Sequence, residues 1–245
     1  MQRSNARRRL FSLPWHYLLD ALDKREPPGE RARRAWRRNR FLLYLGYGTG
    51  LRLAEITEAK LGDLKRMAGE GLGDSFWVLE VRGKGQRLRE VPLVETVARE
   101  LRAYLAARAL PEDLQGIDRE LPLIERLRED TFEAPRSGAP KTTLATSSVY
   151  WSLKRFFAAC ATALEAEGYP HAAVRLRSAS THWLRHTHGT LALKAEIPLT
   201  TVRDSLGHAN LATSGIYLHE DLVERKRQME RLFGKSGAAA EKNSG

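Results

Sequence analysis

Two short apolar segments separated by a glycine-rich turn set the main constraint on the fold. Residues 76–81 and 88–93 are rich in the β-branched and aromatic residues of strands, and the turn between them holds Gly83-Lys84-Gly85-Gln86. We expect a weaker strand near 63–67. The other periodic segments predict helices. The sequence therefore predicts a mainly α chain with a small antiparallel β-sheet, of the α+β class.

The clearest helical signal is a set of apolar residues that recur on one helix face, in a segment that ends near Gly168 and Pro170. We expect Thr49 to cap a helix at 51–60, with Arg52 in its first turn, and Gly207 to end the helix at 199–206. The apolar face consists of Val149, Leu153, Phe156, Phe157, Cys160 and Leu164. Further helices are expected over 15–22, 31–47, 94–109, 119–129, 181–195, 211–219 and 220–233, and a surface loop over 131–143.

The charge balance favours a polyanionic partner. Lysine and arginine total 41 against 30 acidic residues, which gives a net charge of +11 and a pI near 10.0. Lys and Arg side chains placed on phosphates release condensed counterions, so DNA or RNA is favoured, although a basic surface alone is also compatible with these numbers. The single cysteine, Cys160, excludes an intramolecular disulfide and fits a cytoplasmic location. No segment has the length and hydrophobicity of a membrane span.

Most of the candidate catalytic residues lie between Thr181 and Glu220. His182 and Arg185 form a His-x-x-Arg pair, His208 follows Leu-Gly, and Tyr217 comes shortly before the last predicted helix. A guanidinium fork, two titratable donors and a phenol make a set suited to phosphate chemistry. Arg52 in GTGLRLAE and Lys84 in the GKG turn add two cations beside glycines that let a ligand approach closely.

Each of these residues could also have a purely structural role. His182 and His186 stand one helical turn apart and could bind zinc, but Trp183 occupies the position of the metalloprotease glutamate. His186 and His188 are expected to join a packing or hydrogen-bond network in the core. Arg52 could simply pair with Glu55 at i+3. Lys84 could belong to a charged hairpin turn, His208 could cap the C-terminus of a helix, and Tyr217 could be a half-buried aromatic.

The motifs together resemble the tyrosine recombinase, or phage integrase, family. They are TGLRLAEI, VRGKGQRLREVPL, HWLRHTHGT, SLGHAN and TSGIYLH, and the resemblance covers roughly residues 35–230. It implies the family's catalytic-domain fold and six catalytic residues: Arg52, Lys84, His182, Arg185, His208 and Tyr217. It implies no metal ion and no cofactor. The implied partner is double-stranded DNA.

The resemblance also implies a mechanism. Tyr217 attacks a DNA phosphorus and expels the 5′ oxygen, leaving a 3′-phosphotyrosyl link that a second 5′-hydroxyl can reverse. Arg52 and Arg185 hold the non-bridging oxygens, while Lys84 protonates the leaving oxygen. His182 assists Tyr217 or positions the phosphate, and His208 donates to a non-bridging oxygen.

The resemblance further implies a homo-tetramer on DNA, assembled through the C-terminal segment 220–233. We expect residues 1–30 to be a basic linker without a complete core-binding domain, 31–233 to be the catalytic domain and 234–245 a disordered tail. Two other functions stay open from the residues alone: DNA relaxation of the type IB topoisomerase kind, and DNA binding without catalysis by a recombinase fragment.

Overall fold

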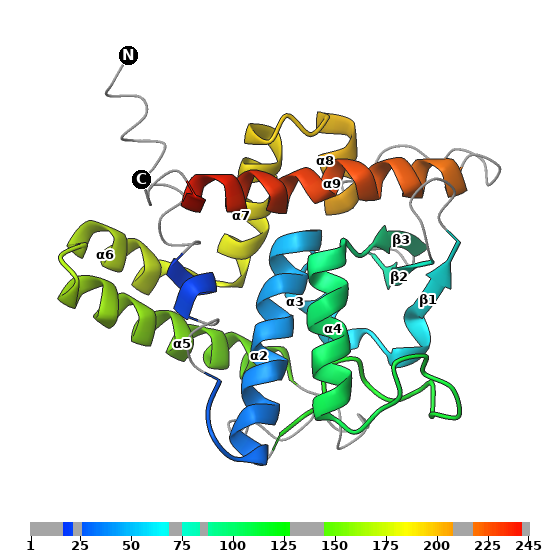
Figure 1. Cartoon of the computed structure of the whole chain (residues 1–245), viewed down its shortest axis with the longest axis horizontal. Coiled ribbons are helices and arrows are strands. Elements are labelled where there is room, and N and C mark those ends of the chain that lie inside the picture. Colours follow the sequence, from blue (N-terminus) through cyan, green and yellow to red (C-terminus); the bar gives the residue numbers. More distant parts are fainter. Residues whose placement is uncertain are drawn as a thin grey trace.

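The computed structural model describes residues 17–21, 26–68, 75–83, 88–127, 145–207 and 218–241. Residues 17–21 are helical, and the later elements surround a central helix, α2, as Figure 1 shows. Within the described residues, no helix is both long and apolar enough to cross a membrane. The elements are α2 Glu30–Thr49, α3 Leu53–Glu58, the short 3-10 helix η1 Leu61–Asp63, β1 Leu64–Met67, β2 Phe76–Arg82, β3 Leu88–Pro92, α4 Glu95–Ala107, α5 Thr146–Ala166, α6 Pro170–Ser178, α7 Thr181–Lys194, α8 Leu199–Leu206 and α9 Leu218–Glu241.

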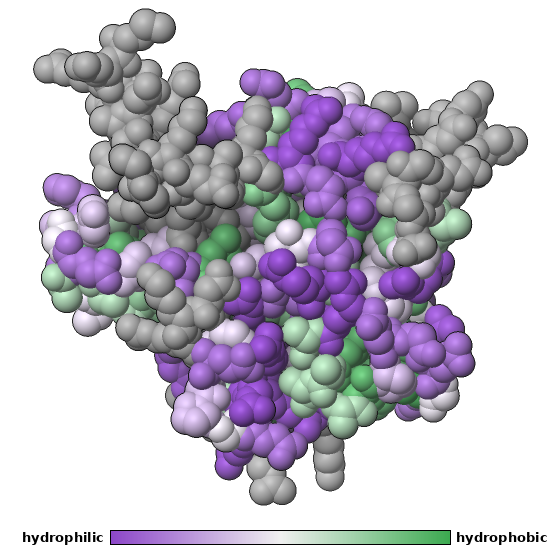
Figure 2. Space-filling view, viewed as in Figure 1, coloured by the Kyte–Doolittle hydropathy of each residue, from purple (hydrophilic) through white to green (hydrophobic). Residues whose placement is uncertain are grey.

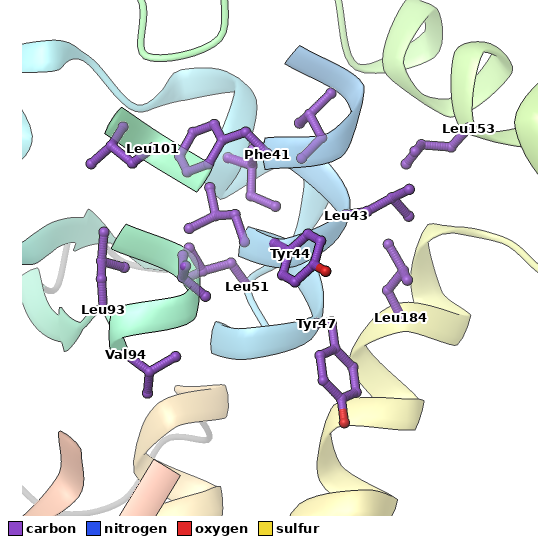
Figure 3. Packing of buried hydrophobic residues seen from close by; sticks show 14 of the residues in the cluster. Phe41, Leu43, Tyr44, Tyr47, Leu51, Leu93, Val94, Leu101, Leu153 and Leu184 are labelled. Atoms are coloured by element: carbon purple, nitrogen blue, oxygen red, sulfur yellow. The ribbon is translucent and has the colours of Figure 1, made fainter. Parts of the chain in front are cut away.

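The second half of α2 is the centre of the hydrophobic core. Every residue from Phe41 to Thr49 is buried, so this helix has neighbours on all sides. Phe41 stacks on Tyr104 of α4 with ring centroids 5.5 Å apart. Leu184 of α7 lies beside Leu43 of α2 on another side (Figure 3). Because α2 is held between α4 and α7, its C-terminal end has a fixed position.

The predicted sheet is present, with strand order β1-β2-β3 and both pairs antiparallel. Successive β2 side chains point to opposite faces. Trp77, Leu79 and Val81 enter the main core, whereas Phe76 and Val78 form a second cluster that also contains Leu222 and Val223 of α9. The sheet is therefore covered on both faces, and β2 is buried along most of its length.

The predicted long helix is confirmed as α5, and its Cys160 is buried at 6% exposure in the main core. The structure adds a helix that we did not predict. Pro170 begins α6 as well as following the end of α5. Proline is favoured in the first helical turn because its missing N–H has no partner there in any case. We interpreted Pro170 only as a signal for the end of α5, although it is also a signal for the start of α6.

Two expectations about local structure were wrong. Thr49 does not cap the next helix; it is the last residue of α2, and its hydroxyl donates to Leu45 O at 2.5 Å. The expected helix at 119–129 is absent over the described part, 119–127. The chain there forms turns and an isolated antiparallel bridge between Lys60 and Pro122, and Leu123 N–H donates to Ala59 O at 2.8 Å. Pro122 explains the difference, because it disfavours helical backbone in the preceding residue and provides no N–H.

The last helix, α9, lies across the end of α2 in Figure 1 and contributes to the core of its own chain. Phe233 stacks against Tyr44 at 6.3 Å and meets Tyr47 edge-on at 5.3 Å. The surface over α9 is mainly hydrophilic (Figure 2). The helix continues to Glu241, into the region that we expected to be a disordered tail. The expected helix at 211–219 and loop at 131–143 fall outside the described residues, except for the end of the former, where α9 begins at Leu218.

The segment expected to be an N-terminal linker also reaches the core. Leu18 is fully buried in the main cluster, and Tyr17 Oη donates to Glu167 Oε1 of the α5–α6 turn at 2.8 Å. The packed unit therefore includes residues before the expected boundary at 31.

Candidate active site

The junction between α2 and α3 places Arg52. Gly50 ends α2 in the left-handed conformation, with φ +65°, and its N–H donates to Gly46 O at 3.0 Å. A Cβ atom at Gly50 would lie 2.7 Å from both His188 and Leu206, so the turn requires glycine for conformation and for space. Arg52 then occupies the cap position of α3, with its side chain 42% exposed. The sharp turn thus brings a basic side chain to the surface.

Glu55 is a buried carboxylate that holds this junction together. Its side chain is 6% exposed. It accepts hydrogen bonds from Arg52 N–H at 2.7 Å and Arg52 Nη1 at 3.1 Å. Arg89 of β3 donates to both carboxylate oxygens, each at 3.0 Å. Burial alone raises the pKa of Glu55, but the bonds from Arg89 and Arg52 outweigh it and hold that pKa below its ordinary value. Glu55 is therefore ionised at neutral pH.

Arg185 reaches the same junction from α7. Its Nη1 donates to Gly50 O at 2.6 Å and its Nη2 to Leu206 O at 2.5 Å. Burial and the nearby charge of Arg52 lower the pKa of Arg185 to about 10, so the guanidinium still carries its charge at neutral pH. Two backbone carbonyls fix its plane while using only part of its donor set. Arg185 thus connects the ends of α2 and α8.

His182 lies on the same face of α7 as Arg185, one turn earlier, and is exposed. Both residues line an open groove of about 400 Å³, together with His186, Gly189, Thr190, Leu193 and Leu206. His186 is exposed there, so the expectation that it joins a core network was wrong. Zinc binding has no support in the described part of the chain, where no group of three or more His, Cys, Asp and Glu side chains is arranged to hold a metal ion.

His188 has the structural role that we expected. It is fully buried, and its Nδ1 lies 2.6 Å from Tyr47 O. Burial lowers the pKa of His188 to about 4, so the ring is neutral at pH 7 and Nδ1 carries the proton that it donates. His188 therefore fixes the last turn of α2 through Tyr47 O, three residues before Gly50, whose carbonyl binds Arg185.

The structure brings together three of the six predicted residues: Arg52, His182 and Arg185. Lys84, His208 and Tyr217 lie outside the described residues. In the sequence, each is joined to a described element: Lys84 follows Gly83, His208 follows Gly207, and Tyr217 precedes the first residue of α9.

Arg89 is a residue of this cluster that our sequence reasoning missed. Arg52 and Arg89 bind the carboxylate of Glu55, and Arg185 lies close enough to feel its charge, so the three arginines and one carboxylate leave a surplus of two positive charges. The signal was the alternation in β3, where Arg89 shares a face with the buried Val91. An arginine on a core-facing strand position requires a buried carboxylate. Such a surplus beside an open groove favours binding of an anion.

The family comparison agrees with this geometry. Residues 18–223 match the model of the Phage integrase family. The chain is 28% identical over 205 residues to tyrosine recombinase XerA of Thermococcus kodakarensis, covering 81% of this chain and 58% of that protein. It is 30% identical over 183 residues to tyrosine recombinase XerC of Chlorobaculum tepidum, covering 74% of this chain and 45% of that protein. The chain belongs to the phage integrase family.

Two solved structures share the fold. The XerH site-specific recombinase bound to its difH substrate aligns with a TM-score of 0.53 at 21% identity, over 85% of this chain and 51% of that chain. The integrase from mycobacterium phage Brujita aligns with a TM-score of 0.52 at 20% identity, over 89% of this chain and 56% of that chain. The predicted fold class is thereby confirmed. The chain spans about half the length of the curated relatives that it matches.

Proposed function

We propose that residues 31–233 form the catalytic domain of a site-specific DNA recombinase or integrase, which cuts and rejoins DNA through a 3′-phosphotyrosyl intermediate on Tyr217. The observation that carries this proposal is the arginine cluster around Glu55, which opens at Arg52 and adjoins the groove of His182 and Arg185. Membership of the phage integrase family supports it.

Arg52 and Arg185 are suited to a phosphodiester that gains negative charge. Arg185 is held by two backbone carbonyls and Arg52 by Glu55, so both guanidiniums are oriented before a ligand arrives. Donors that need no reorganisation give the largest electrostatic stabilisation of a transition state. In this proposal each arginine binds a non-bridging oxygen of the scissile phosphate.

The remaining roles complete the proton balance. Tyr217 Oη forms a bond to phosphorus as the bond to the 5′ oxygen breaks. His182 takes the phenolic proton, because a tyrosine with a pKa of about 10 needs help at neutral pH, and it can also position the phosphate. Lys84 gives a proton to the leaving 5′ oxygen. His208 donates a hydrogen bond to a non-bridging oxygen. The phosphotyrosyl bond keeps the energy for religation.

Double-stranded DNA is the proposed partner, supported by the net charge of +11. The first half of α2 is rich in arginine, but not all of these side chains are available to DNA. Arg34 pairs with Glu125 and Arg40 with Glu100, so these side chains hold the fold together. Arg33 has 54% of its side chain exposed and only a longer contact of 3.7 Å, from its Nε to Glu26 Oε1, so it is better placed for a phosphate contact.

We also propose assembly as a homo-tetramer on DNA through the C-terminal segment. Met229, Leu232 and Phe233 pack into the core of their own chain, so removing all of 220–245 would expose that core. The sharper test keeps the core-packed residues of 220–233 and changes three exposed ones in a single variant, Glu224→Ala, Arg227→Ala and Arg231→Ala. This variant should bind one DNA site normally and form fewer complexes that contain two sites, as measured by native gel. Two-site complexes formed as well as those of the full chain would contradict this assembly mode.

The catalytic proposal is tested with duplexes selected from a random-sequence library for tight binding to the full chain. These duplexes are then nicked at successive positions and incubated in EDTA. When cleavage occurs near a nick, the short 5′-hydroxyl fragment dissociates, so religation is prevented and the covalent adduct accumulates. A covalent DNA adduct that survives SDS should form with wild type and with Tyr169→Phe, an exposed tyrosine used as the matched control. It should be absent with Tyr217→Phe. Tight binding without any adduct would instead support a DNA-binding fragment.

A further inference from the structure

Arg89 lies in β3, five residues after Lys84 in the sequence, and reaches the same carboxylate as Arg52. Its two terminal nitrogens donate to Glu55 in a fork, each at 3.0 Å, and the side chain is 17% exposed. A bidentate arginine–carboxylate pair of this kind has a fixed geometry. The β3 strand is thereby tied to the start of α3.

Glu55 is shared evenly between the two arginines. Oε1 accepts from Arg52 Nη1 and Arg89 Nη1, while Oε2 accepts from Arg52 N–H and Arg89 Nη2. If Arg89 were absent, the carboxylate would neutralise Arg52 alone. With Arg89 present, the three groups carry one net positive charge, and the exposed member is Arg52. Arg89 thus determines how much of the Arg52 charge is offered to a ligand.

Arg89 also contacts the turn that ends α8. Gly207 has φ +62°, and a Cβ atom there would lie 2.8 Å from Arg89 Cζ and 3.0 Å from its Nε. The guanidinium therefore packs directly on the Gly207 backbone. Arg185 donates to the preceding carbonyl, Leu206 O. The turn that leads to His208 in the sequence is fixed by both arginines.

We propose that Arg89 is a positioning residue for the reaction of the proposed function, on which this inference rests. It acts without touching the substrate. Arg89 neutralises part of the charge of the Glu55 carboxylate, so more of the charge of Arg52 is available to the scissile phosphate. It also packs on Gly207 and so fixes the turn before His208 in the sequence.

The test compares Arg89→Gln, Glu55→Gln and the double variant with wild type, using the rate constant of adduct formation at saturating DNA. Arg89→Gln should slow the reaction about 10- to 100-fold, because a displaced or neutralised catalytic group costs this much. Removing Glu55 as well should restore part of the rate, since Arg52 then has no carboxylate. Lys65→Gln, a basic residue of the same sheet that pairs with Glu80, is the matched control and should react like wild type.

A role in folding alone predicts a different result: a smaller fraction of protein that forms the adduct, with an unchanged rate constant. That outcome, or a double variant no faster than Arg89→Gln, would overturn the proposal. If wild type forms no adduct on DNA that it binds, the proposed function fails, and the charge argument is tested by binding. Arg52→Ala should then reduce the slope of log affinity against log salt by about one in wild type and much less in Arg89→Gln. Equal reductions would refute it.

Discussion

Two arginine–glutamate pairs in this protein have the same chemistry and differ in solvent access. Between α2 and α4, the side chains of Arg40 and Glu100 are 8% and 4% exposed. At the start of α3, Glu55 is 6% exposed but Arg52 is 42% exposed. The first pair is closed on both sides, whereas the second is open on the side of the arginine.

The two pairs also differ in the number of arginines that bind the carboxylate. Arg40 gives both its Nε and its Nη2 to Glu100, and the exposed Arg99 adds only a longer contact of 3.6 Å. Glu55 instead accepts hydrogen bonds from two arginines, Arg52 and Arg89. Arg185 lies near enough for the charge of Arg52 to lower the pKa of Arg185. A buried pair with matched charges positions helices, while a cluster with surplus charge at the surface has binding capacity left for an anion.

The largest expected effect is on catalysis at the open pair. Arg52→Ala should slow adduct formation by about 10²- to 10³-fold, the loss typical of one preorganised donor to a developing negative charge. Its free energy of unfolding should change by only about 1 kcal/mol or less, because Glu55 keeps Arg89 and the arginine is exposed. Single-turnover cleavage and urea denaturation measure the two effects. Arg99→Ala is the matched exposed control, and an unchanged cleavage rate in Arg52→Ala would break the comparison.

The closed pair should show the reverse pattern. Glu100→Gln leaves Arg40 buried without its counter-ion, so the free energy of unfolding should fall by roughly 3–5 kcal/mol. The cleavage rate constant of the remaining folded protein should match wild type. Urea denaturation and single-turnover cleavage on one preparation measure both. A slower rate constant with unchanged stability would mean that the two pairs had been assigned the wrong way round.

Gly50→Ala tests whether the turn that presents Arg52 is as constrained as its contacts indicate. Alanine at φ +65° is strained, and its Cβ would lie 2.7 Å from His188 and Leu206. The backbone strain alone costs about 1–3 kcal/mol. Because the close contacts add to it, we expect the free energy of unfolding to fall by more than the strain alone and cleavage to be slower. Gly29→Ala is the control, because Gly29 also has positive φ but nothing within 4 Å of its Cβ position. Equal losses of stability in the two variants would show that the close contacts at Gly50 do not matter.

The most gradual effect is the pH dependence that His188 adds to stability. An unfolded chain protonates this residue near pH 6.5, whereas the folded protein does so near pH 4. Between these values the unfolded state holds more protons, so stability falls as the pH falls, by at most about 1.4 kcal/mol per pH unit. Glu55 adds to this fall only near and below its ordinary pKa of 4.5, since its folded pKa is lower still. His188→Phe should flatten the urea-derived profile between pH 6.5 and 4; an equally steep profile would contradict this.

The fold was predictable where the signal is local. The apolar segment of β2 and the apolar face of α5 lie within single elements, and both predicted elements were confirmed. The stretch around Pro122 was misread because its backbone pairs with residues near Ala59, far away in the sequence. The α6 helix was missed because Pro170 can end one helix and begin another.

The site divides in the same way. The i+3 pairing of Arg52 with Glu55 could be predicted from spacing and is present. The bond from Arg89 to Glu55 joins residues from β3 and α3, and only the tertiary structure brings them together. The roles of the six residues in the reaction stay a proposal.

The most direct measurement of the central claim is to identify the residue that carries DNA after cleavage. Wild type is reacted in EDTA with a nicked duplex that it binds, digested with protease and nuclease, and the nucleotide-bearing peptide is sequenced by mass spectrometry. We expect a single modified peptide, with a 3′-phosphate joined to Tyr217. A nucleotide on another residue, or bound DNA with no modified peptide, would contradict the proposed recombinase chemistry.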